Sequence, residues 1–241
     1  PDRLTSLSAV GGEVLPEQAM SALDLPEIPV WDPLVRVFHW TLVISFCAAY
    51  LSEGELFEAL QDRLSGEWLQ LVHVWAGYLI AGLLLWRVVW GFVGPRHARF
   101  SDFVRGPRES FCYLMDALTL RAARYLGHNP AGGAMIVALL LSLAATIVTG
   151  LALYGADKAM GPLAALLVES SDATIDAIKE AHEAATNCTL LLVAGHLLGV
   201  VWESLLHREH LVRAMISGRT RACTVQRAMT GVAAGVPGLG V

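Results

Sequence analysis

Four long apolar segments are the feature that most restricts what this chain can fold into. They cover approximately residues 35–52, 68–90, 131–154 and 182–202. Each approaches the roughly 20 apolar residues that a helix needs to cross the hydrocarbon core of a bilayer. Only 16% of the 241 residues are charged, against about 25% in an average soluble domain. The pattern therefore predicts an all-α integral membrane protein, folded as a bundle of four transmembrane helices.

The segments that connect these helices alternate in charge. The first connection (53–67) and the third (155–181) are acidic, whereas the second connection and the C-terminal tail are rich in arginine. Because loops with excess lysine and arginine stay in the cytoplasm, this alternation predicts that both termini are cytoplasmic. The formal net charge of −5 offers no basic field for nucleic acid, so membrane lipid rather than nucleic acid is the expected partner.

The regions outside the four segments suggest two tails and a surface helix. Residues 1–30 are polar and contain Pro16, Pro26 and Pro29, which predicts a tail without a cleavable signal peptide. Residues 107–124 form an amphipathic stretch that begins with proline, which predicts a helix lying on the inner membrane surface. Residues 31–206 would then be the membrane domain. Residues 207–241 would be a basic tail, with a second short helix after Leu211.

Four histidines lie inside the apolar segments, where ionisable residues are uncommon and usually functional. His182 and His196 are 14 residues apart, so on a helix they differ by about 40° around the axis and about 21 Å along it. They share a face and lie in opposite leaflets. The direction of each helix then pairs His39 with His196 near the inner surface, and His73 with His182 near the outer surface. The third segment has no histidine and is expected to serve as a packing wall.

Two neutral histidines from facing helices suit haem iron better than a bare metal ion. Zinc needs more ligands, and copper would also be under-coordinated. Haem iron needs only two axial ligands, because the porphyrin supplies the other four. Two such pairs predict two b haems with bis-histidine iron, an arrangement that favours electron transfer over oxygen chemistry. The alternative for any single histidine is a hydrogen bond to a neighbouring carbonyl.

Small and basic residues beside the histidines extend the candidate site. Gly77 and Gly199 would let a flat ring lie close to a helix, although glycines also serve ordinary helix packing. Arg36 precedes His39 by one turn and could pair with a haem propionate. Its alternative role is that of a snorkelling interfacial arginine.

From about residue 30 to residue 221 the sequence resembles the bacterial cytochrome b561 family, which includes the b-type cytochrome subunits of membrane-bound nickel-iron hydrogenases. The resemblance rests on WDPLVRVFHW around His39, HVWAG at His73, WGFVGPRHARFSDF after the second segment, GHNPAGG before the third, and the His182/His196 pair. It implies a four-helix bundle with two b haems, one near each membrane face and held by the same histidine pairs. It also implies a location in the bacterial inner membrane.

The function predicted from the residues and the resemblance is transmembrane electron transfer by a dihaem b-type cytochrome. The resemblance implies that the electrons pass between the quinone pool and a periplasmic redox partner, such as a c-type cytochrome, a dehydrogenase or a hydrogenase. The acidic outer connections would favour a basic partner. Hydrogenase subunits of the family usually have an additional helix, whereas we expect four spans here because residues 231–241 are too few for a fifth.

Three alternatives remain open. One is a superoxide or small-molecule quinone oxidoreductase that works without a protein partner. Another is a structural subunit that carries haem within a larger respiratory or photosynthetic complex. The third is a non-redox channel or transporter, which the unbroken third segment disfavours. Association as a homodimer or in a larger complex is compatible with the lipid-facing surface of a small bundle.

Overall fold

A computed structural model describes residues 27–29, 31–53, 66–123, 125, 128–206 and 210–221. The chain divides into two compact units, Pro29–Gly218 and the combined terminal segments Pro1–Ile28 and Arg219–Val241. Two short strands, β1 (Glu27–Pro29) and β2 (Arg219–Arg221), pair in a two-stranded sheet. The sequence did not predict this sheet, because strands of three residues at opposite ends of a chain leave no recognisable hydrophobic pattern.

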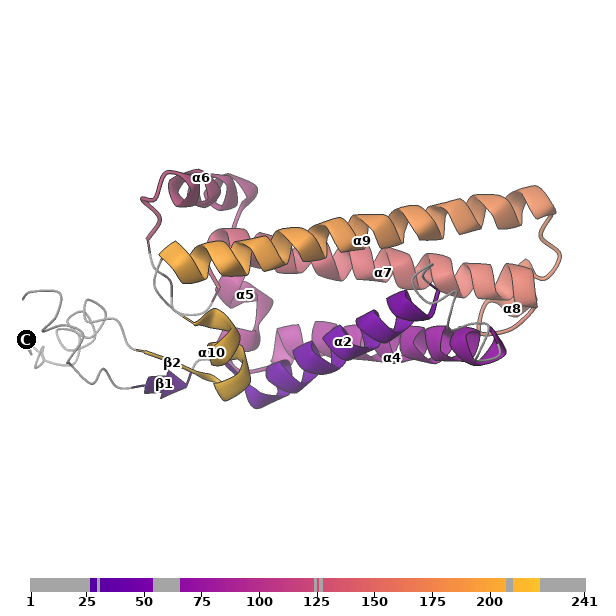
Figure 1. Cartoon of the computed structure of the whole chain (residues 1–241), viewed down its shortest axis with the longest axis horizontal. Helices are drawn as coiled ribbons and strands as arrows, with labels where there is room; N and C mark the ends of the chain where they lie inside the picture. Colours follow the sequence, from indigo (N-terminus) through magenta and orange to yellow (C-terminus); the bar gives the residue numbers. More distant parts are fainter. Residues whose placement is uncertain are drawn as a thin grey trace, which may run out of the picture. The chain divides into compact units, whose positions relative to one another are not determined.

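Four helices of the larger unit are long and apolar enough to cross a membrane. Figure 1 shows these helices running along the length of the larger unit. They are α2 (Pro33–Ser52), α4 (Gly66–Val93), α7 (Pro130–Lys158) and α9 (Asp172–Leu206). The prediction of four apolar helices in an all-α chain is therefore confirmed.

Side-chain caps fix the starts of two of these helices. An Asp32 side-chain oxygen accepts a hydrogen bond from the backbone N–H of Leu34 at 2.6 Å. Asn129 caps α7 in the same way, accepting from the N–H of Gly132 at 2.6 Å. In each case proline occupies the first helical turn, where its missing N–H costs no hydrogen bond. Both boundaries are thus encoded locally.

The fourth helix begins earlier than the sequence indicated. We predicted a span of 182–202, but α9 starts at Asp172 and continues for 35 residues. At about 1.5 Å per residue it is about 52 Å long, well beyond the roughly 30 Å hydrocarbon core. Its first turns are polar, so apolar content did not reveal them. Much of the predicted third connection is therefore helical, since it also contains α8 (Ala164–Leu167).

The second connection contains the amphipathic helix in a shorter form than predicted. It consists of η2 (Arg96–Ala98), α5 (Phe100–Phe103) and α6 (Pro107–Leu118). We expected α6 to reach residue 124, but Leu120 has a φ of 60°, a left-handed conformation that a right-handed helix does not continue through. The short helix expected after Leu211 is present as α10 (Leu211–Ser217).

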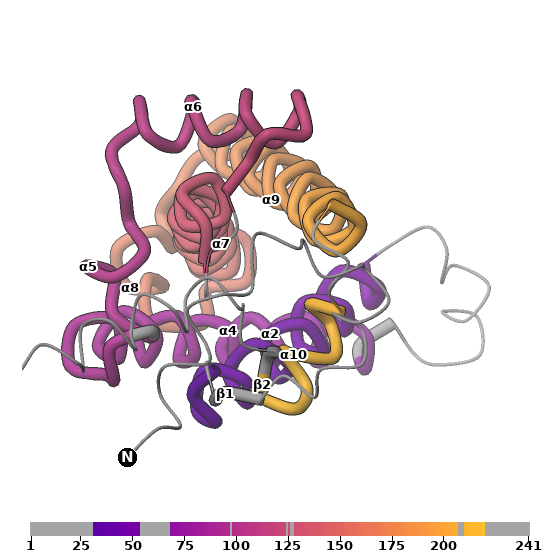
Figure 2. Tube along the Cα trace, turned by 90° about the vertical axis from the view of Figure 1, so that its left-hand side faces the viewer, coloured from indigo at the N-terminus to yellow at the C-terminus, as the bar shows by residue number. Residues whose placement is uncertain are grey.

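Polar contacts hold α6 against the end of α9. The hydroxyl of Tyr113 donates to the Glu203 carboxylate at 3.1 Å, and the indole N–H of Trp202 donates to the carbonyl of Ala117 at 3.1 Å. Figures 1 and 2 show α6 crossing the α7 and α9 pair at one end. The apolar side chains of α6 that remain exposed are Phe111, Leu114, Met115 and Leu118. An exposed apolar face suits a helix that lies on a membrane surface.

The long helices pack as two pairs. α2 packs against α4 and α7 against α9, and α4 joins the pairs by contacting α7. The α7–α9 pair is clamped by Thr189, which is fully buried and hydrogen bonds to the hydroxyls of Ser142 at 2.6 Å and Thr146 at 3.1 Å. In the described part of the chain, α9 has no extensive backbone contact with α2 or α4. Each predicted histidine pair therefore joins helices whose backbones are not closely packed.

Candidate functional site

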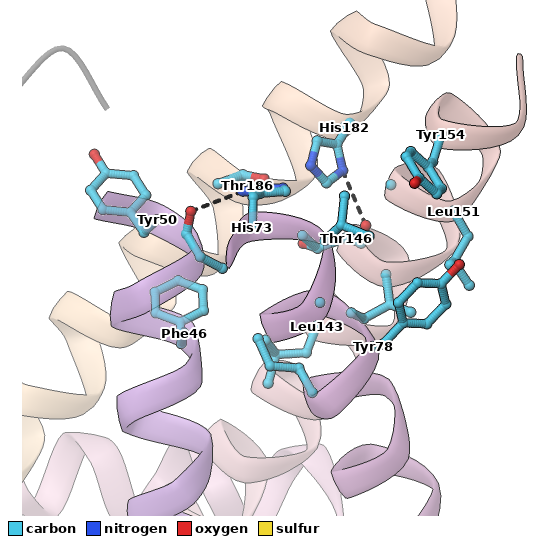
Figure 3. Close-up of a pocket in the computed structure, with 16 residues that line it drawn as sticks. Phe46, Tyr50, His73, Tyr78, Leu143, Thr146, Leu151, Tyr154, His182 and Thr186 are labelled. Carbon is cyan, nitrogen blue, oxygen red and sulfur yellow. Dashed lines mark hydrogen bonds between the residues drawn. The ribbon is translucent and has the colours of Figure 1, made fainter. Parts of the chain in front are cut away.

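His73 on α4 and His182 on α9 face each other between the two helix pairs (Figure 3). Their ring centroids are 6.2 Å apart and their planes differ by 79°. A metal atom bonded at about 2 Å to one nitrogen of each ring would place the two centroids about 6 Å apart. The observed separation of the ring centroids is compatible with a metal atom between the two rings. We call this arrangement the outer pair.

The second nitrogen of each ring in the outer pair contacts a backbone carbonyl. Nδ1 of His73 lies 2.9 Å from the carbonyl oxygen of Ala49. Nδ1 of His182 lies 3.1 Å from the carbonyl oxygen of Thr146 and 3.1 Å from the hydroxyl of Thr149. Because a carbonyl can only accept, these contacts place a proton on each Nδ1 and leave the Nε2 lone pair available. Metal-bound histidines are usually oriented by this kind of contact.

A pocket surrounds the outer pair, with about 730 Å³ of empty space in and around it. Part of this space is open to the surroundings, and the cavity itself measures about 110 Å³. Most of its lining is apolar or aromatic, and it includes Phe46, Tyr50, Tyr78, Tyr154 and Gly77. A Cβ atom added to Gly77 would meet nothing within 4 Å. Gly77, predicted from the sequence, therefore faces open space in this pocket.

Helix α7 does more than the predicted packing wall would. A Cβ atom at Gly150 would lie 2.9 Å from Cε1 of His182, so only glycine lets this imidazole approach the helix so closely. Thr146 and Thr149 hold the same ring from the preceding turn. From the sequence alone we assigned no role to these residues. The signal that could have identified these residues is the sequence TIVTG (146–150), in which two threonines and a glycine occur at the depth of a histidine.

His39 on α2 and His196 on α9 are the second pair predicted from the sequence, which we call the inner pair. Both side chains are half-buried. Nδ1 of His39 is buried and has no hydrogen-bond partner among the described residues. Gly199, one turn after His196, is exposed, and a Cβ atom there would meet nothing within 4 Å. No other described helix therefore packs closely against Gly199.

Buried polar atoms without a partner lie near the start of α2 and near the end of α4. Within the described part of the chain they are Nε of Arg36, Nδ1 of His39, Nε1 of Trp40, Nη1 of Arg87 and Nε1 of Trp90. Native proteins leave few buried donors unpaired, so such a cluster calls for a ligand that brings acceptor atoms. Arg36 is only partly engaged, because its Nη2 donates to the carbonyl of Ile216 on α10.

The donor set of each pair limits which group it fits. Among the described residues, no group of three or more His, Cys, Asp and Glu side chains is placed to hold a metal ion. Each pair offers two imidazole nitrogens. Two nitrogens are too few for a bare zinc ion, but they complete an iron atom that already has four equatorial ligands. The outer pair, with its oriented rings and apolar pocket, fits a haem.

Comparisons with known proteins point to one family. The sequence pattern of prokaryotic cytochrome b561 matches residues 30–218. A relative from Bradyrhizobium diazoefficiens, named "Probable Ni/Fe-hydrogenase B-type cytochrome subunit", is 27% identical over 236 residues, covering 88% of this chain and 92% of the relative. A Rhodobacter capsulatus protein of the same name is 26% identical over 90% of each chain. An Escherichia coli K12 relative, named "Probable Ni/Fe-hydrogenase 1 B-type cytochrome subunit", is 30% identical over 52% of this chain and 59% of its own length.

Proposed function

Since the chain belongs to the prokaryotic cytochrome b561 family, we propose that it is a dihaem b-type cytochrome that transfers electrons across a bacterial inner membrane. The observation that carries this proposal is the outer pair. The ring centroids of His73 and His182 are 6.2 Å apart, and each Nδ1 contacts a backbone carbonyl oxygen. These residues would hold one haem b, and His39 and His196 would hold another. A bound haem b supplies one-electron redox chemistry at its iron.

The protein's own residues would bind and tune the haems. A carbonyl that accepts from Nδ1–H makes the opposite ring nitrogen a stronger ligand and fixes the plane of the ring. The apolar pocket lowers the local dielectric and excludes water, which is one of the ways a protein sets a haem potential. With a histidine pair holding each haem, no coordination position would remain open for oxygen. These features favour electron transfer over catalysis at the iron.

The smaller candidate residues have matching roles. Gly77 would lie against the outer macrocycle, because it lines the pocket and faces open space. Gly199 would serve the inner macrocycle in the same way. Arg36 would direct its unpartnered Nε toward a propionate of the inner haem while Nη2 keeps its bond to Ile216.

The charge pattern and the relatives' names support an orientation and a partner. The arginine-rich segments favour a cytoplasmic location for both termini and α6, and the outer pair would then lie near the periplasm. We propose that a Ni/Fe hydrogenase docks there and that quinone exchanges electrons with the protein. The names of the relatives favour a hydrogenase over a c-type cytochrome as the redox partner.

Counting haems in variants of the purified protein tests the ligand assignment. We expect two b haems per chain in a pyridine haemochrome assay, and one in either His182→Leu or His196→Leu, each losing a different component of the reduced-minus-oxidised spectrum. His210→Gln is the matched control, because the exposed His210 lies outside the long helices. Loss of both haems, or of neither, from the single variants would contradict the pairing.

A reduction assay tests the partner. Membranes that contain this protein and the host's Ni/Fe hydrogenase should show haem b reduction under hydrogen, followed by reoxidation when a soluble quinone analogue is added. Membranes without the hydrogenase should show neither change. Reduction by a c-type cytochrome but not by hydrogen would refute the hydrogenase assignment and leave the electron-transfer proposal standing.

A further inference from the structure

Arg87 is a buried positive charge inside a membrane-spanning helix. Its side chain belongs to α4 and the residue is only 3% exposed. Moving an unpaired charge out of water is costly, and arginines at membrane depth are usually paired or line a functional path. No described carboxylate forms an ion pair with Arg87. This residue therefore needs a counter-charge that the described chain does not supply.

Two aromatic rings form a cage around the guanidinium. The Arg87 Cζ atom lies 4.9 Å from the ring centroid of Phe100 and 5.8 Å from that of Phe103. Glycines let α5 approach closely, since a Cβ atom at Gly91 would overlap the Phe100 ring and one at Gly133 would overlap the Phe103 backbone. Cation–π contacts favour the charge, but they provide no acceptor for in-plane N–H groups. Nη1 of Arg87 is buried and has no partner among the described residues.

The position of Arg87 along the bundle matches the inner pair. Arg87 follows His73 by 14 residues, so the two lie within about 40° on one face of α4 and about 21 Å apart along it. The same spacing separates His182 from His196 on α9. A side-chain contact independently supports this depth of Arg87 in the bundle. The ring centroids of Trp86, the residue before Arg87, and Phe38, the residue before His39, are 5.7 Å apart.

We propose that Arg87 forms an ion pair with a propionate carboxylate of the haem held by His39 and His196. This inference rests on the proposed function, because it requires a haem at the inner pair. Arginine matches a carboxylate with two parallel N–H donors, and the Phe100 and Phe103 cage holds the guanidinium in one orientation. Arg87 is thus a positioning residue, which fixes the inner haem and neutralises one of its negative charges.

Redox titration of Arg87→Gln tests the proposal, with Arg96→Gln as the matched control. The Arg96 side chain is 85% exposed and lies outside the transmembrane helices. Losing a positive charge beside the haem disfavours the reduced state. In Arg87→Gln we expect the equilibrium constant for reduction of the inner haem to fall at least tenfold, which corresponds to about 59 mV for a one-electron couple. The outer haem, and both haems of the control, should keep their wild-type potentials.

The outcomes separate this inference from the proposed function. Two haems with unchanged potentials in Arg87→Gln would overturn the ion pair and leave the electron-transfer proposal intact, whereas a wild-type protein that binds no haem would refute the proposed function itself. Selective loss of the inner haem from Arg87→Gln would support the ion pair. If Arg87→Gln does not fold, Arg87→Lys keeps the charge but loses the planar fork. Its inner haem should transfer to excess apomyoglobin at least about threefold faster than in wild type, and an unchanged rate would overturn the proposal.

Discussion

Replacing Gly150 by alanine should selectively weaken haem binding at the outer pair. The added Cβ atom would lie 2.9 Å from Cε1 of His182 and 3.3 Å from its Nδ1. Carbon atoms in contact prefer a separation of about 3.5–4.0 Å, so the imidazole must move by about 0.6 Å or more. Coordination distances tolerate only about 0.2 Å. The displaced ring therefore cannot keep both its place at the iron and its hydrogen bond to the Thr146 carbonyl.

The expected magnitude follows from the loss of this orienting contact. Disturbing the groups that orient a metal ligand typically costs about 10–100-fold in affinity. We therefore expect at least about a tenfold loss of outer-haem affinity, which is about 1.4 kcal/mol. The fold itself should not weaken, because alanine is favoured over glycine in a helix by roughly 0.5–1 kcal/mol and the free ring can rotate away. Transfer of haem to apomyoglobin, followed at the outer-haem absorption band, measures the change.

Gly82→Ala is the control for this measurement. Gly82 lies within α4, is exposed, and has nothing within 4 Å of an added Cβ atom. It should gain the same helix propensity and keep both haems at wild-type affinity. Wild-type affinity of the outer haem in Gly150→Ala would refute the reasoning. Equal losses in the two alanine variants would assign the effect to helix stiffening instead of contact with His182.

Two further predictions concern contacts that hold the bundle together. Thr189→Val removes two interhelical hydrogen bonds, each worth about 0.6 kcal/mol in a membrane. Thermal unfolding of the variant should begin a few degrees lower, with the haem content unchanged. An unaltered Tm would show that these two hydrogen bonds contribute nothing to stability. Burial, and then the adjacent Glu203 carboxylate, raise the pKa of Tyr113. The protonated phenol therefore stabilises the docking of α6 fully below about pH 10, the ordinary tyrosine pKa, and this contribution is lost as the pH rises through the raised pKa. Tyr113→Phe should make α6 more sensitive to trypsin at pH 7 than it is in the wild type. Equal cleavage rates in the two proteins would contradict the role of the bond.

The sequence predicted the helices well wherever apolar content and length carry the information. The starts of α2 and α7 lie within two residues of the predicted ones, because Asp32 and Asn129 cap them locally. The start of α9 at Asp172 was missed because its first turns stand beyond the apolar segment. The end of α6 was missed because it depends on the left-handed conformation of Leu120. Such boundaries are set by backbone conformation and tertiary contacts, which produce no hydrophobic periodicity in the sequence.

The candidate site divides in the same way between sequence and structure. The spacing of His182 and His196 on one helix face follows from 3.6 residues per turn, and the directions of the helices pair each of them with a histidine at the same depth. The sequence alone therefore determined the class of the protein, the number of its apolar helices and which histidines to consider together.

Only the tertiary structure decided what surrounds those histidines. The spacing of residues does not reveal that the carbonyls of Ala49 and Thr146 contact two imidazoles. It does not reveal that Gly150 makes room for one of these rings. Nor does it reveal that Arg87 lies against the rings of Phe100 and Phe103. These contacts join segments that are distant in the chain. They depend on how side chains fill the space between packed helices, whereas the periodicity of a single helix records only which face each residue occupies.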